Sequence, residues 1–239
     1  MERKEKNLLS LILGSPKYNQ PGDPDFDVFR ESTLQMALDV ARFLYAFTNV
    51  GEKAAISKDY YLGLRKINSV RHPSEPSLLL VTVLLYLNSL EQIGNIFSKN
   101  NEYGIRYAIK LFADKNASIK QVFGQDFDTE CTMIQHLRHA LAHNFGLVNI
   151  DPASKSPKEK FTLSYINDKS AKVVTLSKIK WNGDYADKSD ETSVEINVPT
   201  LVKMTESIFA EAQNQFESIF ESMTDAWFSE IQTRFTIRC

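Results

Sequence analysis

The feature that most constrains the fold of this chain is an apolar run from Leu78 to Leu90. The run is shorter than the roughly 20 apolar residues that a membrane-spanning helix needs. It also contains Asn88 and Ser89 and leads directly into Glu91. We therefore expect a buried central helix, around which the other elements pack, and no membrane span.

Apolar residues recur at helical spacing in most of the remaining chain. A short turn is expected at residues 118–123, and helices are expected at residues 27–48, 54–67, 77–99, 103–113 and 126–145. Asp126 or Asp128 is a suitable N-cap for the last of these, and Gly146 is a natural stop. Pro199 is suited to begin one long final helix, with an apolar stripe that extends to Trp227.

Between Gly146 and Pro199 the hydrophobic period changes, and turn residues separate short apolar segments. Strands are expected at residues 147–150, 161–166, 173–181 and 193–198. The sequence therefore predicts a mainly α fold, an antiparallel helical bundle with a small β-hairpin or sheet insertion before the last long helix. The insertion covers about 147–198 of a single domain that covers residues 1–239.

Charge and cysteine content narrow the classes of partner and compartment. The formal net charge of −2 argues against nucleic-acid binding by bulk charge, so such binding would need a local patch. Lys172, Lys178 and Lys180 lie in a lysine-rich segment and are weak candidates for RNA contacts, which a solvated loop surface explains at least as well. The two cysteines make no disulfide framework, which favours a reducing, cytoplasmic location.

The helix expected at residues 126–145 gathers the chain's densest set of functional groups. Three of the four histidines, His136, His139 and His143, lie on it together with Arg138. At about 100° per residue all four share the non-core face. Arg138 and His143 are about 140° apart around the helix and about 7.5 Å apart along its axis, so one helix does not bring both onto one small group. Two such helices related by a two-fold axis would line one groove with both pairs.

These residue types suit the cleavage of RNA without a metal. Histidine titrates near neutral pH and can take a proton from a hydroxyl group or return one. Arginine stays charged and fits phosphate oxygens with a planar fork. The ribose 2′-hydroxyl would be the nucleophile, with arginine offsetting the charge that builds on the phosphorus.

The segment Arg138-His139-Ala140-Leu141-Ala142-His143 resembles the motif of the HEPN superfamily, an arginine and a polar residue followed by three residues and a histidine. In that family the motif lies on a late helix of an α-helical bundle. The resemblance implies a HEPN-like domain, a homodimer with facing motifs, and metal-independent endoribonuclease activity. It implies Arg138 and His143 as the catalytic pair, with His139 at the polar position.

The same resemblance implies a toxin or defence protein that acts on RNA, with a protein antitoxin or regulator as a partner. Some HEPN proteins are non-catalytic modules that bind RNA, a nucleotide or a protein, and this alternative stays open. Glu91 is a candidate supporting residue that could pair with Arg138 if buried, or face solvent at the end of its helix. Asn144, directly after His143, is a further supporting candidate.

Two other interpretations of the histidines were considered. The first is a solvated helix face without special chemistry. The second is a zinc site, because His139 and His143 have the i, i+4 spacing of a helical metal pair. The intervening residues supply no glutamate to activate a water, and no remote third ligand is evident, so no metal or other cofactor is predicted. Cys131 lies near the start of the same helix, where the pKa of a thiol can fall, but nothing else supports a nucleophile there.

Overall fold

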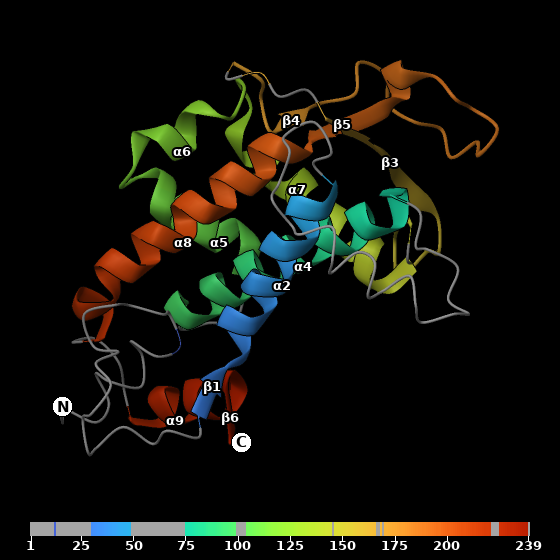
Figure 1. The fold of residues 1–239 in the computed structure, drawn as a ribbon. Helices are drawn as coiled ribbons and strands as arrows, with labels where there is room; N and C mark the ends of the chain where they lie inside the picture. The colour runs from blue at the N-terminus through green and yellow to red at the C-terminus, as the bar shows by residue number, and fades with distance from the viewer. Residues whose placement is uncertain are drawn as a thin grey trace.

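The structure is a computed structural model that describes residue 12 and residues 30–48, 75–98, 104–144, 146–165, 168, 170–220 and 225–238. Helices surround a central helix, α4 (Glu75–Phe97), and a small sheet lies at one end of the molecule (Figure 1). Val83, Leu87 and Leu90 of α4 have no exposed surface, which confirms the predicted central helix. Among the described residues, Leu79–Phe97 is long and apolar enough, by length and composition only, to cross a membrane. However, 56% of this apolar stretch is buried inside the protein, as in a core helix.

Helix α2 (Thr33–Thr48) packs along α4. Both helices are connected to α8 (Val198–Phe220) by side-chain hydrogen bonds. Arg42 of α2 makes two hydrogen bonds to the Glu206 carboxylate of α8, at 2.9 and 2.6 Å. The hydroxyl of Tyr86 on α4 donates to the same carboxylate at 3.1 Å. Burial, followed by the negative charge of Glu206, raises the pKa of Tyr86. Glu206 therefore joins three helices through charge-assisted hydrogen bonds.

Helix α5 (Gly104–Ala113) approaches α4 at two glycines. A Cβ atom built at Gly94 would lie only 1.7 Å from the carbonyl oxygen of Gly104. The backbones of α4 and α5 therefore touch at a point where no other residue fits. A short helix, α6 (Ala117–Gln121), follows α5, with Asn116 as its N-cap.

Helix α7 (Phe127–Asn144) carries the predicted site, and its ends agree with the sequence prediction. Asp126 is the N-cap, because its Oδ1 accepts from the backbone N–H of Thr129 at 3.2 Å. At the other end the N–H of Gly146 points back to the carbonyl oxygen of Ala140 at 3.5 Å. This contact gives one carbonyl group of the last turns a hydrogen-bond donor from beyond the end of the helix.

The insertion is a four-stranded mixed sheet in the order β2-β3-β5-β4. The strands are β2 (Val148–Ile150), β3 (Pro157–Ser164), β4 (Val174–Thr175) and β5 (Ser193–Asn197). Strands β2 and β3 pair antiparallel, as do β4 and β5, whereas β3 and β5 pair parallel. A hairpin alone therefore does not describe this sheet.

The strand expected at residues 173–181 is wrong over most of its length. Pairing ends after Thr175, and the chain then follows an irregular path to a turn at Gly183, where φ is +90°. Trp181 is buried there, and its indole N–H donates to the carbonyl oxygen of Asp184 at 3.0 Å. The apolar residues of this segment thus anchor a loop, which hydrophobic pattern alone does not distinguish from a strand.

The single long helix predicted from Pro199 onward is also wrong. Residues 198–220 form α8, and Asp225–Phe235 form a separate helix, α9, which does not continue the α8 axis (Figure 1). After α9, β6 (Thr236–Arg238) pairs antiparallel with β1 (Arg30–Ser32) just before α2. This pairing holds α9 against the opposite end of the helices from the sheet (Figure 1).

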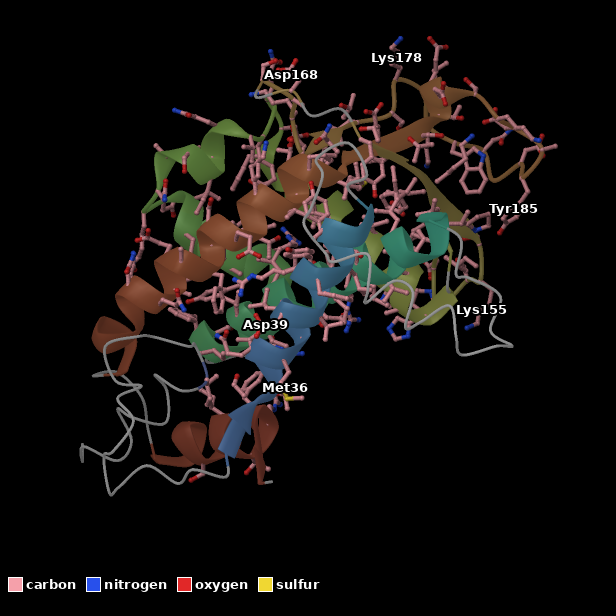
Figure 2. The ribbon with its side chains drawn as sticks, viewed as in Figure 1. Met36, Asp39, Lys155, Asp168, Lys178 and Tyr185 are labelled. Carbon is pink, nitrogen blue, oxygen red and sulfur yellow. The ribbon has the colours of Figure 1, made fainter. Side chains whose placement is uncertain are left out.

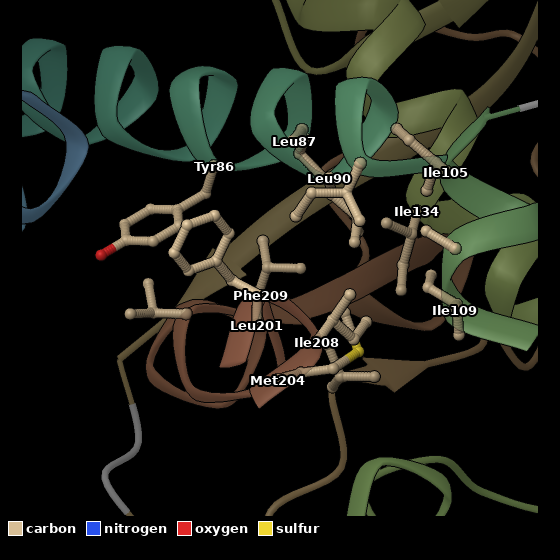
Figure 3. Close-up of a cluster of buried hydrophobic side chains, with 14 of the residues drawn as sticks. Tyr86, Leu87, Leu90, Ile105, Ile109, Ile134, Leu201, Met204, Ile208 and Phe209 are labelled. Atoms are coloured by element: carbon tan, nitrogen blue, oxygen red, sulfur yellow. The ribbon is translucent and has the colours of Figure 1, made fainter. Parts of the chain in front are cut away.

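The core is formed where α4, α5, α7 and α8 meet. Figure 3 shows Tyr86 of α4 beside Phe209 of α8, and Leu90 of α4 on the side of Ile134 of α7. The same hydrophobic cluster continues into the sheet through buried residues of β3, β4 and β5. The mainly α prediction with a small sheet is therefore confirmed. The helix expected at residues 54–67 lies outside the described residues.

Candidate functional site

Arg138 lies at one edge of the polar face of α7 and is paired with Glu91 of α4. The distance from Arg138 Nη2 to Glu91 Oε2 is 2.6 Å, and the two side chains are 24% and 25% exposed. The structure thus forms the pair that was one of two alternatives for Glu91. The Nε of Arg138 is buried and has no acceptor among the described residues. The guanidinium group is therefore held by a carboxylate while one of its donors stays unfilled.

His139 and His143 form the middle of this face. Their ring centroids are 4.4 Å apart with the rings tilted by 50°, as their i, i+4 spacing allows. His143 is exposed and lies in the last helical turn, and His139 is half-buried. Burial lowers the pKa of His139, and the positive charges of His143, Arg138 and His136 lower it further. His139 is consequently a neutral imidazole at pH 7 that can accept a proton.

His136 lies at the other edge and faces the sheet. Its Nδ1 is 3.2 Å from Oε1 of Glu159 on β3, without hydrogen-bond alignment, and the contact is an ion pair only when His136 is protonated. The side-chain amide of Asn149 on β2 donates to the other Glu159 oxygen at 2.7 Å. Burial alone would raise the pKa of Glu159, but the contacts with His136 and Asn149 outweigh it and lower the pKa.

Sequence reasoning missed Glu159 and Asn149. The available signal was weak: Glu159 is a rare acidic residue in a lysine-rich segment, and its partner depends on how the sheet docks on α7. The structure therefore gives the polar face of α7 a carboxylate at each edge, Glu91 on one side and Glu159 on the other, with His139 and His143 between them.

Asn144 is the last residue of α7, and its side chain lies outside the part of the chain that the structure describes. Its supporting role stays a prediction.

The three lysines predicted for RNA contacts do not form one cluster. Lys178 contacts Glu191 at 3.3 Å, and Figure 2 shows it at the outer rim of the molecule. The Lys172 ammonium donates to the carbonyl oxygen of Gln121 at 2.8 Å, and Lys180 is exposed. The Glu191 carboxylate partly offsets the positive charge that Lys178 offers to a phosphate backbone.

Other lysines of the same segment are also neutralised by acidic residues that lie outside it. Lys158 is 2.6 Å from Asp151, and Lys160 is 3.3 Å from Asp187. The contact with Lys158 and backbone hydrogen bonds hold the pKa of Asp151 well below its usual value. A local excess of lysine in the sequence is thus balanced in space.

Nucleophile and metal chemistry receive no support from the remaining groups. Cys131 is fully buried, and burial raises the pKa of its thiol to about 12, opposite to the direction that a nucleophile needs. In the described ranges, no group of three or more His, Cys, Asp or Glu side chains is arranged to hold a metal ion.

Comparisons of the chain with models of protein families, with curated proteins and with solved structures find no match. The site combines an arginine held by a carboxylate with two neighbouring histidines whose rings are tilted by 50°, and His143 of this pair is exposed.

Proposed function

We propose that this chain is a metal-independent endoribonuclease with a HEPN-like antiparallel bundle, whose site is formed by α7 from two copies. Arg138 binds the scissile phosphate, and His143 transfers protons. The proposal is supported by one observation above all: an arginine fixed by the central helix and a histidine pair lie on the same face of α7.

The reaction follows from these groups. A neutral histidine takes the proton of a ribose 2′-hydroxyl, and the 2′-oxygen attacks the adjacent phosphorus. The bond from phosphorus to the 5′-oxygen breaks, and a protonated histidine donates its proton to that oxygen. The products are a 2′,3′-cyclic phosphate and a 5′-hydroxyl end. Arg138 offsets the charge that builds on the phosphate oxygens during the attack.

The separation of Arg138 and His143 favours an assembly of two copies. Within one helix the two residues share the polar face but are about 140° apart around the axis, so one copy does not bring both onto the same phosphate. A two-fold axis beside α7 places His143 of one copy opposite Arg138 of the other. His139, with its lowered pKa, supports the neutral state that the base requires.

A second candidate function is a non-catalytic module that binds RNA, a nucleotide or a protein through the same face. The Glu91 contact favours it, because a carboxylate already occupies the guanidinium fork that a phosphate would use. This candidate predicts that binding is lost in variants of the face without any cleavage by the wild type.

The test is cleavage of single-stranded RNA by the purified full chain in EDTA, followed by analysis of the product ends. We expect 2′,3′-cyclic phosphate ends, and a loss of about a hundredfold or more in His143→Ala and Arg138→Ala. Because His143 is exposed, its replacement leaves the fold intact.

Arg42→Ala is a matched control for Arg138→Ala. Both arginines place Nη2 2.6 Å from a glutamate Oε2 on another helix, so both variants break an ion pair between helices. Cleavage by Arg42→Ala at the wild-type rate, with Arg138→Ala inactive, would separate a role in chemistry from a role in folding. Wild-type activity in both His143→Ala and Arg138→Ala would overturn the proposal, and RNA binding without cleavage would select the second candidate.

A further inference from the structure

His139 and His143 lie one helical turn apart on α7 with their imidazole rings close together. The ring centroids are 4.4 Å apart, and the ring planes are tilted by 50°. An imidazole nitrogen binds Zn²⁺ at about 2.0–2.1 Å, so two imidazoles at neighbouring positions of one ion have ring centroids about 4.5–5 Å apart. The observed separation is close to this value, so a small rotation of the two side chains lets both rings reach the same ion.

The backbone that carries this pair is fixed by the core. Between the two histidines, Ala140 is fully buried and Leu141 is only 3% exposed, so the opposite side of α7 is packed. His143 is exposed and His139 is half-buried. An ion can therefore reach the two rings from solvent and keep water at its other positions, while the helix holds the rings at a fixed spacing.

The third histidine of α7 is engaged elsewhere. Nδ1 of His136 is buried and lies 3.2 Å from Oε1 of Glu159 on β3. Across the part of the chain that the structure describes, no group of three or more His, Cys, Asp or Glu side chains is arranged to hold a metal ion. The pair therefore supplies two ligands, whereas a structural zinc site has four. Two ligands suit an ion that binds reversibly and exchanges with solvent.

Each basic side chain beside the pair lies next to a carboxylate from another element. Arg138 Nη2 is 2.6 Å from Oε2 of Glu91 on α4. His136, when it is protonated, forms an ion pair with Glu159 on β3. These carboxylates offset the positive charge of their partners, so the repulsion that a divalent cation meets at the pair is reduced.

We propose that His139 and His143 together chelate one transition-metal ion of the class of Zn²⁺, Ni²⁺ and Cu²⁺. Imidazole nitrogen suits these ions, and Cu²⁺ should bind most tightly of the three, whereas Mg²⁺ and Ca²⁺ take oxygen ligands.

The chelate has a consequence that rests on the proposed function. A metal-bound neutral imidazole has no lone pair left to accept a proton, so the ion prevents His143 from transferring protons. The ion is thus a reversible inhibitor of RNA cleavage and not a cofactor.

The test of binding combines electron paramagnetic resonance of the full chain with Cu²⁺ and isothermal titration calorimetry with Zn²⁺. We expect hyperfine coupling to two nitrogens in the wild type. In His139→Gln and in His143→Gln the affinity for Zn²⁺ should fall by about tenfold or more, which corresponds to about 1.4 kcal/mol. His136→Gln is the matched control, because it removes a histidine of the same helix and should leave both measurements unchanged. Circular dichroism checks that each variant is folded.

Three results would overturn the chelate. The first is an affinity for Zn²⁺ that is unchanged in both His139→Gln and His143→Gln, because the ion would then lie elsewhere. The second is a loss in only one of these variants, because a single imidazole would then hold the ion. The third is equal binding of Mg²⁺, which would contradict nitrogen ligands.

Inhibition is measured separately. Zn²⁺ should slow RNA cleavage by the wild type, with half-maximal effect at the Kd from calorimetry, and excess EDTA should restore the rate. The same concentration of Mg²⁺ should have no effect. Cleavage at the full rate with Zn²⁺ bound would overturn the inhibition. No cleavage in EDTA would contradict the proposed function alone, because calorimetry decides the chelate without any RNA.

Discussion

Arg138 on α7 and Glu91 on α4 meet with their Nη2 and Oε2 atoms 2.6 Å apart, at the boundary between the core and the polar face of α7. Leu90, the residue before Glu91, is fully buried in the core. The position of the motif arginine is therefore set by the central helix and not by α7 alone. A change in the packing of α4 would move the guanidinium group relative to the two histidines.

Replacing Glu91 with alanine should destabilise the fold by about 1–3 kcal/mol, because a partly buried guanidinium group loses its charged partner. Urea unfolding gives the free energy of unfolding. In a double-mutant cycle, Arg138→Ala should cost less in the Glu91→Ala background than in the wild type. Additive costs would mean that the contact contributes nothing to stability.

Stability should fall as the pH is lowered from 6.5, and His139 should cause part of that fall. Its pKa in the folded state lies below the ordinary value of 6.5, so the unfolded state binds the proton more readily. The stabilisation is present above pH 6.5 and is lost as the pH falls through the lowered folded pKa. As the pH is lowered, the urea concentration at the midpoint of unfolding should decrease less for His139→Gln than for the wild type. The same pH dependence in both proteins would refute this assignment.

Gly94→Ala should destabilise the protein by about 2 kcal/mol or more, because the new Cβ meets backbone that cannot move aside. The sign of the change in the free energy of unfolding decides between two arrangements of the helices. If the helices did not touch at this point, alanine would instead stabilise α4 by about 0.5–1 kcal/mol through its higher helix propensity. Thermal unfolding followed by circular dichroism distinguishes the two outcomes.

The thiol of Cys131 should resist alkylation in the native protein, since it is buried and its pKa is raised to about 12. A Cys239→Ser variant isolates this thiol, because the chain has two cysteines. Mass spectrometry after iodoacetamide treatment at pH 8 should find no adduct until urea is added. Rapid labelling of the folded variant would show that the first turn of α7 opens.

The parts of the fold that the sequence predicts are those where local pattern and burial agree. The run around Leu87 is apolar on most sides, so a buried helix is the structure that best satisfies it. Asp126 and Gly146 bound α7 through local hydrogen bonds. The stripe that reaches Trp227 also has helical spacing, yet α8 and α9 are separate. A spacing of this kind describes which side of each turn is apolar, and it carries no information on where the axis changes direction.

The candidate site shows the same limit. The motif on α7 is local, so its residues and their shared face follow from the sequence. Pairing with Arg138 was one of two alternatives that the sequence left open for Glu91, and the structure shows that contact. The contact of His136 with Glu159 depends on the docking of β3 against α7, which no local pattern encodes.

The parallel pairing of β3 with β5 imposes an order of events on folding. The hairpin of β2 and β3 joins segments that are close in the sequence, so it can form early in folding. Strand β5 pairs with β3 only after the long segment between them has formed a loop that brings the two strands together. Until then one edge of β3 has unpaired backbone groups that another chain could capture. Refolding at high protein concentration should therefore lose material to aggregation while the helices are already formed, before β5 seals the sheet.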